Sequence, residues 1–353
     1  MIIPAPDNEP LTLRILISYW YFQNVDVGAM VRKLEQLSGI KKLDVFADSG
    51  AFTAESSGVH IELSEYVKWI HKWDEYLTVY LNLDVIGDQG GTDANQTKLE
   101  AMGVNPVPVI TFQRNGSDYE LLARYLDKYE YISLGGMVPF TGSPQRVMPH
   151  LIKCFKMAGD RAVYHGLGLT NWTILKALPF YSVDSSSWIG GVRYGNLTLF
   201  DDRRGDWRRF SLAKPDAFRG ADGLFRRYGY EARQFVTRDV QKYHDVAAVQ
   251  GLSYMAAENW LRRRHGLVPK PSDLENMGLR IYLANIMPPL WEDAAAQLGK
   301  LGMKLYLAGG DQYMRTIAPS VSAINATGLK IYLADTVDAH WLPQAAAKLE
   351  SAL

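Results

Sequence analysis

The chain has 353 residues, 47% of them hydrophobic and 22% charged, so it can bury a large core and is not disordered throughout. Basic and acidic residues balance at 38 each, which argues against a protein that binds nucleic acid over its whole surface. The one cysteine, Cys154, excludes an internal disulfide and a Cys-rich zinc site and fits a cytoplasmic setting. Asp7 and Glu9 do not fit a signal peptide, and no run of about eighteen apolar residues predicts a membrane span.

Short apolar runs alternate with longer amphipathic stretches up to about residue 185, a rhythm typical of β-α units around a parallel sheet. The candidate strands are Arg14–Trp20, Leu43–Ala47, Leu77–Leu83, Val107–Phe112, Tyr131–Leu134, Ala162–Gly166 and Phe180–Val183. The helix-like segments between them include Val27–Leu37, Glu62–Trp73, Tyr119–Lys128, Pro144–Met157 and Asn171–Ala177. Seven strands in this rhythm predict an α/β fold of the TIM-type (β/α)8 barrel class, with an open doubly wound sheet as the alternative.

The rhythm breaks after the seventh strand, where residues 191–250 predict an Arg-rich insertion and a helix. From Arg193 to Arg233 the chain holds nine Arg and one Lys against five Asp and one Glu, a local excess of four positive charges. One hairpin is expected around Tyr194-Gly195-Asn196-Leu197. Helices are expected to resume at Val236–Val249 and Ser253–Arg264.

Residues 251–353 contain a small internal repeat: GLRIYLAN from Gly278, GMKLYLAG from Gly302 and GLKIYLAD from Gly328. Each copy has the pattern of a buried strand entered through glycine. The first copy could supply the eighth barrel strand, after strands one to seven in residues 1–190, and the other two a C-terminal α/β extension. True duplication and the ordinary likeness of β-α units both explain the repeat.

Polar residues follow every predicted strand from the second to the seventh, and in a β/α barrel the active site lies at these carboxyl ends. In chain order they are Asp48, Asp84, Gln113, Gly135-Gly136, His165 and Asp184. Taken singly, each has an ordinary structural explanation: the aspartates could cap helices, the glycines could ease a turn, and His165 could be a core residue. Their convergence on one rim is what favours a site.

Two such carboxylates suit substitution at the anomeric carbon of a sugar. One acts as nucleophile and forms a covalent sugar–enzyme intermediate, while the other, with a raised pKa, carries protons to and from the leaving group. A third carboxylate with a carboxamide can read the polar edge of a guanine-like ring, and an aromatic residue such as Phe52 can stack on it.

The ordered set FADSGAF, NLD, FQ, LGGM and HGLG followed by YSVD resembles the tRNA-guanine transglycosylase superfamily over residues 43–190. The resemblance implies that Asp184 is the nucleophile and Asp48 the general acid/base. It implies a base site made by the residues Ser49, Phe52, Asp84, Gln113, Gly135, Gly136, Met137 and His165. Met137 would lie near the 7-position of a deazaguanine.

Departures from that family point to one of its branches. The CxCxxC…H zinc site cannot exist with one cysteine, and the DSGGFQ motif reads DSGAFT, with Thr53 at the Gln position. The chain is more similar to the DpdA branch, phage and bacterial enzymes that place 7-deazaguanines in DNA. The insertion would then replace the zinc module as a phosphate-binding surface, through Arg193, Arg203, Arg204, Arg208 and Arg209.

The expected partners are double-stranded DNA with a flipped base, a 7-deazaguanine base and proteins of a DNA-modification system, with no membrane, cofactor or metal. The expected location is the cytoplasm, that of the host if a phage encodes the chain. The alternatives are a tRNA-guanine transglycosylase, a barrel glycosidase acting on small glycosides, and a non-catalytic nucleic-acid-binding protein. The insertion could also be a salt-bridged surface loop, and Arg262-Arg263-Arg264-His265 either a second basic patch or favourable charges at a helix C-terminus.

Overall fold

The computed structural model describes residues 12–35, 42–113, 116–140, 142–187, 195–236, 242–265 and 280–283. Eight strands form one sheet in the order β3-β2-β1-β10-β7-β6-β5-β4, and every pair in it is parallel. Their bounds are β1 Thr12–Ser18, β2 Lys42–Asp48, β3 Val79–Tyr80, β4 Val109–Thr111, β5 Tyr131–Gly135, β6 Val163–Gly166, β7 Ser182–Ser185 and β10 Arg280–Leu283. The expected α/β class and all seven expected strands are confirmed.

The first copy of the C-terminal repeat supplies the eighth strand. β10 lies between β1 and β7, with Ile15 opposite Leu283 and Tyr282 opposite Asp184. A parallel bridge pairs Leu81, the residue after edge strand β3, with Val107, two residues before edge strand β4. Two backbone hydrogen bonds make this bridge: Val107 N donates to Tyr80 O (2.9 Å) and Asn82 N donates to Val107 O (3.0 Å).

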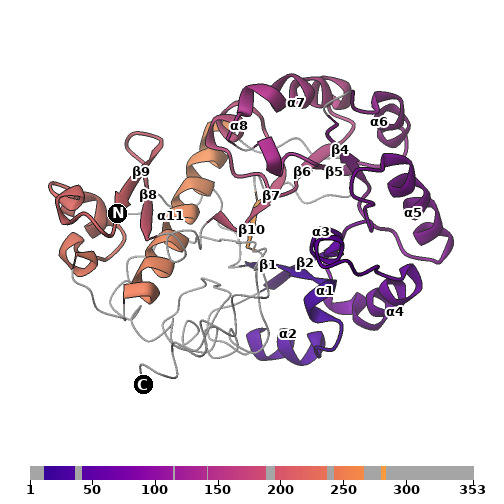
Figure 1. The fold of residues 1–353 in the computed structure, drawn as a ribbon, viewed down its shortest axis with the longest axis horizontal. Helices are drawn as coiled ribbons and strands as arrows, with labels where there is room; N and C mark the ends of the chain where they lie inside the picture. Colours follow the sequence, from indigo (N-terminus) through magenta and orange to yellow (C-terminus); the bar gives the residue numbers. More distant parts are fainter. Residues whose placement is uncertain are drawn as a thin grey trace.

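Helices connect the strands and lie on the outside of them (Figure 1). Their bounds are α1 Tyr19–Phe22, α2 Val27–Glu35, α3 Ala51–Ser56, α4 Leu63–Trp73, α5 Gln89–Ala101, α6 Tyr119–Leu126, α7 Pro144–Ala158 and α8 Trp172–Ala177, with 3-10 turns η1 Asp74–Tyr76 and η2 Val138–Phe140. The five helices expected by name are confirmed. The polar α5, with two glycines in its first turn, has little amphipathic pattern and was not among them.

The insertion forms a small unit beside the sheet. It comprises the antiparallel hairpin β8 Asn196–Asp201 and β9 Asp206–Ser211, then η4 Pro215–Phe218, α10 Asp222–Arg227 and η5 Ala232–Phe235. The expected turn around residues 194–197 is wrong: Asn196 and Leu197 lie within β8, and the chain reverses between Asp201 and Asp206. Gly205 supplies the positive φ of 63° that this tight reversal uses.

One aromatic cluster anchors the insertion to the rest of the fold. Trp172 of α8 and Trp260 pack against Phe200 and Trp207 of the hairpin, with ring centroids 4.9 to 6.1 Å apart. Trp260 belongs to α11 Lys242–His265, which lies beside the hairpin in Figure 1. The two helices expected at 236–249 and 253–264 are therefore wrong as separate elements, because one helix continues through Gly251.

Residues 284–353 lie outside the described residues, and with them the second and third repeat copies. The C-terminal extension and the three-part domain scheme stay predictions. Within the described residues, none of the helices has the length and apolar character needed to cross a bilayer.

Candidate active site

Three carboxylates meet where strands of the parallel sheet end. Asp48 is the last residue of β2, Asp84 follows β3, and Asp184 lies near the end of β7. Asp84 and Asp184 are both close enough to Asp48 to raise its pKa by charge repulsion. In the described part of the chain, neither Asp48 nor Asp84 has a Lys or Arg ion-pair partner. The convergence expected from the strand ends is therefore present for these three residues.

Asp48 occupies an environment that favours its protonated form. Burial first, then the charges of Asp84 and Asp184, raise its pKa to about 7, although the backbone N–H groups of Gly50 and Ser49 oppose the rise. Gly50 N donates to Asp48 Oδ2 at 3.0 Å. The alternative that Asp48 caps the next helix does not hold, because Gly50 is the N-cap residue of α3. Near neutral pH this carboxyl can both give and accept a proton.

Asp84 is a second carboxyl whose charge is disfavoured. Burial and then the charge of Glu55 raise its pKa to about 6. Helix capping does not explain it either, because Asp88 is the N-cap of α5 and accepts a hydrogen bond from Gly91 N at 3.0 Å.

Asp184 has a different set of contacts, because two nitrogen atoms lie against one of its oxygens. Gly168 N donates to Oδ1 at 2.6 Å, and His165 Nε2 lies 3.2 Å from the same atom. The residue is 8% exposed, so its carboxylate is shielded but accessible at the rim. Both contacts are to Oδ1, and no described residue forms a hydrogen bond with Oδ2.

His165 lies beneath Asp184 and not on the rim where a base would bind. It is 0% exposed, its ring stacks on Phe46 with centroids 4.6 Å apart, and its Nδ1 lies 2.6 Å from Ser182 Oγ. Ser182 is a participant that the sequence prediction missed. Its position two residues before Asp184, on the same face of β7, was the signal that could have found it.

The other residues expected in the base site differ in how far they are exposed to solvent. Phe52 is 55% exposed on α3 and free to stack on a ring, whereas Ser49 is buried. Gln113 is partly exposed two residues after β4, and its carboxamide makes no hydrogen bond to the described residues. Met137 is buried.

The backbone conformation by itself accounts for glycine in the Gly135-Gly136 pair, apart from the binding role expected of it. Gly135 O accepts a hydrogen bond from Phe112 N at 2.9 Å. Gly136 has a φ of 75°, and a Cβ there would lie 2.6 Å from Thr111 Cγ2 and 2.8 Å from Phe112 O. Only glycine fits this turn, so its presence does not by itself identify a base-reading backbone.

The arginines of the insertion differ in whether they form ion pairs, and only some of them were expected to bind phosphate. Arg219, Arg227 and Arg233 form ion pairs within the insertion, as the salt-bridged-loop alternative expects. Arg203, Arg204, Arg208 and Arg209 have no ion-pair partner among the described residues, and all but Arg208 are exposed. Arg193 lies outside the described residues.

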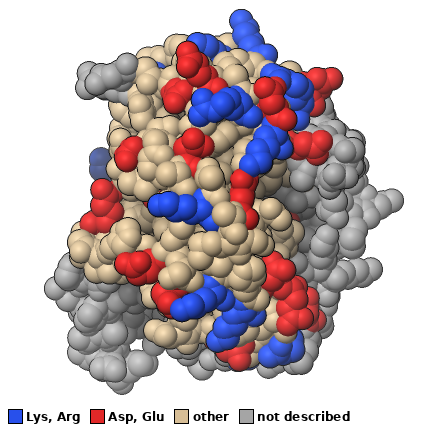
Figure 2. All heavy atoms as spheres, turned by 90° about the vertical axis from the view of Figure 1, so that its right-hand side faces the viewer, with Lys and Arg blue, Asp and Glu red and all other residues tan. Residues whose placement is uncertain are grey.

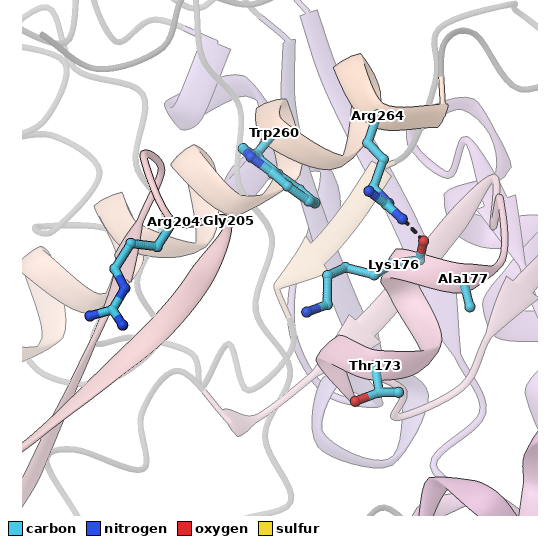
Figure 3. A pocket seen from close by; sticks show the side chains of 7 residues that line it. All are labelled: Thr173, Lys176, Ala177, Arg204, Gly205, Trp260 and Arg264. Atoms are coloured by element: carbon cyan, nitrogen blue, oxygen red, sulfur yellow. Dashed lines mark hydrogen bonds between the residues drawn. The ribbon is translucent and has the colours of Figure 1, made fainter.

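Arg204 lines a cleft of about 380 Å³ between the hairpin turn, α8 and α11 (Figure 3). Lys176, Arg264 and Trp260 line it too, together with Thr173, Ala177 and Gly205, so the lining carries three cations and no acid. Arg264 Nε donates to Lys176 O at 2.8 Å and His265 Nε2 lies 2.6 Å from Leu175 O. Part of the Arg262–His265 cluster therefore binds the last carbonyls of α8, as favourable charges at a helix end do.

A comparison with protein-family models and with curated proteins finds no match to this chain. The likeness to the transglycosylases therefore stands on the strand-end motifs themselves.

Proposed function

We propose that this protein exchanges guanine in DNA for a 7-deazaguanine, such as 7-cyano-7-deazaguanine, through a covalent Asp184–sugar intermediate. The observation that carries the proposal is the unequal pair of aspartates at one sheet edge. Asp48 has a pKa raised to about 7, and Asp184 has one oxygen held by two donors. A double displacement at C1′ needs these two roles, a proton carrier and an aligned nucleophile.

The reaction follows from those roles. Asp184 Oδ2 forms a bond to C1′ of the flipped nucleotide while the C1′–N9 bond breaks, and guanine leaves with the electron pair and a proton from Asp48. The incoming 7-deazaguanine returns a proton to Asp48, and its N9 attacks C1′ to release Asp184. In this proposal Asp84, Gln113 and the backbone at Gly135-Gly136 read the base, and Ser49, Phe52 and Met137 complete its site.

A closed (β/α)8 barrel is the architecture that suits this site. The strand order and the parallel bridge from Leu81 to Val107, which links the two edge strands, support closure. In such a barrel the ends of β2 and β7 face a common mouth, which brings the two aspartates to one ligand.

The surface supports a nucleic-acid substrate, and the likeness of the motifs to the DpdA branch is the reason for proposing DNA. Base flipping brings C1′ out of the stack, and cationic side chains must hold the phosphates while the base is extruded. The four arginines of the hairpin without ion-pair partners supply such cations in a chain whose overall charge is zero.

The test is base exchange with labelled guanine on DNA and tRNA substrates in parallel, followed by mass spectrometry of nucleosides after incubation with 7-cyano-7-deazaguanine. We expect exchange and 7-deazaguanine insertion in DNA. Exchange on tRNA alone would overturn the DNA assignment. Hydrolysis of small glycosides with no exchange on either nucleic acid would replace the proposal with the glycosidase alternative.

A further inference from the structure

A chain of buried polar side chains runs behind Asp184 through three neighbouring strands. His165 of β6 lies 3.2 Å from Asp184 Oδ1 and 2.6 Å from Ser182 Oγ of β7, and Ser182 Oγ in turn contacts the Tyr131 hydroxyl of β5. His165 and Ser182 are both 0% exposed and Tyr131 is buried. A polar chain of this kind inside a sheet core costs folding free energy unless its members satisfy one another.

The direction of each hydrogen bond follows from the donors available. In its attacking, ionised form Asp184 can only accept, so the hydrogen between it and His165 belongs to Nε2. In the neutral imidazole Nδ1 is then an acceptor, and Ser182 must donate to it. Ser182 Oγ accepts from the Tyr131 hydroxyl, which completes a chain in which every donor points toward the carboxylate.

We propose that Ser182 and Tyr131 hold His165 as its neutral Nε2–H tautomer, which makes His165 a positioning residue that aligns the nucleophile Asp184. The inference rests on the proposed function for the identity of the nucleophile. It replaces contact with the base as the role of His165, because the stacked and fully buried ring has no free edge to offer a ligand.

The alignment acts in both halves of the exchange. His165 and Gly168 bind Oδ1 and so leave Oδ2 toward C1′ in the first step. When the C1′–Oδ2 bond breaks in the second step, its electron pair returns to the Asp184 carboxylate. The same two N–H groups stabilise that departing carboxylate without moving.

The first experiment observes the tautomer on the full chain and needs no activity. The ¹⁵N chemical shifts of His165, assigned by the loss of its signals in His165→Gln, should show a neutral ring with hydrogen on Nε2 at pH 7. Ser182→Ala should produce a mixture of tautomers. The control is Ser133→Ala, which removes a buried hydroxyl with no hydrogen-bond partner among the described residues. An imidazolium or an Nδ1–H ring in the unaltered protein would overturn the inference.

The second experiment follows formation of the covalent adduct with DNA in single turnovers. His165→Phe, which keeps the stack on Phe46, should slow adduct formation by about 10²-fold, and Ser182→Ala by roughly tenfold, the range typical of residues that orient a reacting group. Ser182→Thr should restore most of the rate. Tyr131→Phe should slow it severalfold, whereas Tyr164→Phe should not, because Tyr164 bonds Cys154 O on the other side of β6.

Two results separate this inference from the proposed function. A higher KM for the free base with unchanged adduct rate in His165→Gln would show a base contact and refute positioning. If the unaltered protein forms no adduct with DNA or tRNA, the proposed function fails, and the tautomer measurement still decides how His165 is held.

Discussion

The strand-end site and the hairpin of the insertion differ in the sign of the charges that lack an ion-pair partner among the described residues. At the site, Asp48, Asp84 and Asp184 gather with His165 as the one ion-pair candidate that the described residues offer. In the hairpin, Arg203, Arg204, Arg208 and Arg209 gather without an acid partner among the same residues. The α4–α6 flank behaves differently, since its basic and acidic side chains are interspersed and pair, for example Arg124 with Asp93 (Figure 2).

The difference indicates a division of tasks. Under the proposed function, the carboxylates of the site act on the base and the sugar, whereas the hairpin arginines hold phosphates and take no part in bond breaking. A variant should therefore damage chemistry or binding, but not both.

The largest effect is expected from Asp184→Asn. Without an attacking carboxylate oxygen, exchange and the trapped adduct should fall by at least roughly 10³-fold. DNA affinity, measured by fluorescence anisotropy, should stay within about twofold of the original because no hairpin cation is changed. A parallel loss of DNA affinity would break the division between site and hairpin.

Asp48→Asn should have the next largest effect. The rate of exchange should fall by about 10² to 10³-fold, which lies within the range for loss of a general acid/base. The adduct should still form slowly with a base that leaves without protonation. Asp88→Asn, which alters the exposed N-cap of α5, is the matched control and should leave the exchange rate unchanged. Equal rates for Asp48→Asn and the unaltered protein would remove Asp48 from the chemistry.

Reversing the unpaired arginines to Glu should weaken DNA binding by tenfold or more at low salt. It should also flatten the salt dependence of binding, by about one unit of slope for each phosphate that the protein no longer neutralises. Arg219→Glu with Arg233→Glu is the control, because these arginines are also exposed but already paired with Asp216 and Glu231. Identical salt slopes for both sets would place the DNA elsewhere.

The smallest expected effect is a change in the pKa of Asp48. Since Asp84 raises the pKa of Asp48 more than Asp184 does, Asp84→Asn should lower that pKa further than Asp184→Asn, as followed by ¹³C NMR of the Asp48 carboxyl. The folded-state pKa is about 7 against an ordinary 3.8, so the stabilising contribution of Asp48 is full below pH 3.8 and is lost as pH rises through 7. The Tm of the unaltered protein should therefore fall relative to Asp48→Asn over that range. The opposite order of pKa shifts would contradict the arrangement of the three carboxylates.

Sequence periodicity was enough to place the strands and to put Asp48, Asp84 and Asp184 at their ends, because strand alternation and the parallel-sheet rule are local and general. The hairpin turn was misplaced because Tyr194-Gly195-Asn196 has turn residues, whereas the actual reversal uses Asp201-Asp202-Arg203-Arg204-Gly205, which has the pattern of a charge cluster. The helix α5 was missed because capping by Asp88, not an apolar face, marks its start.

The relation of His165 to Ser182 and Tyr131 lies beyond local patterns. These residues are 17 to 51 positions apart, and each looks like an ordinary strand residue in sequence. Only the order of β5, β6 and β7 in the sheet brings them together. Which arginines are paired was likewise hidden, since the acids that neutralise Arg227 come from the hairpin 25 and 26 residues earlier.

One hydrogen bond connects the hairpin turn to the segment of chain that contacts Asp184. The Trp172 indole Nε1 donates to Gly205 O at 2.9 Å, which fastens the hairpin turn to the first residue of α8. Four residues before Trp172, Gly168 holds the oxygen of Asp184. The hairpin turn and Asp184 Oδ1 are thus held at the two ends of one short segment, residues 168–172. A shared tether of this kind sets the spacing between the hairpin and the strand end.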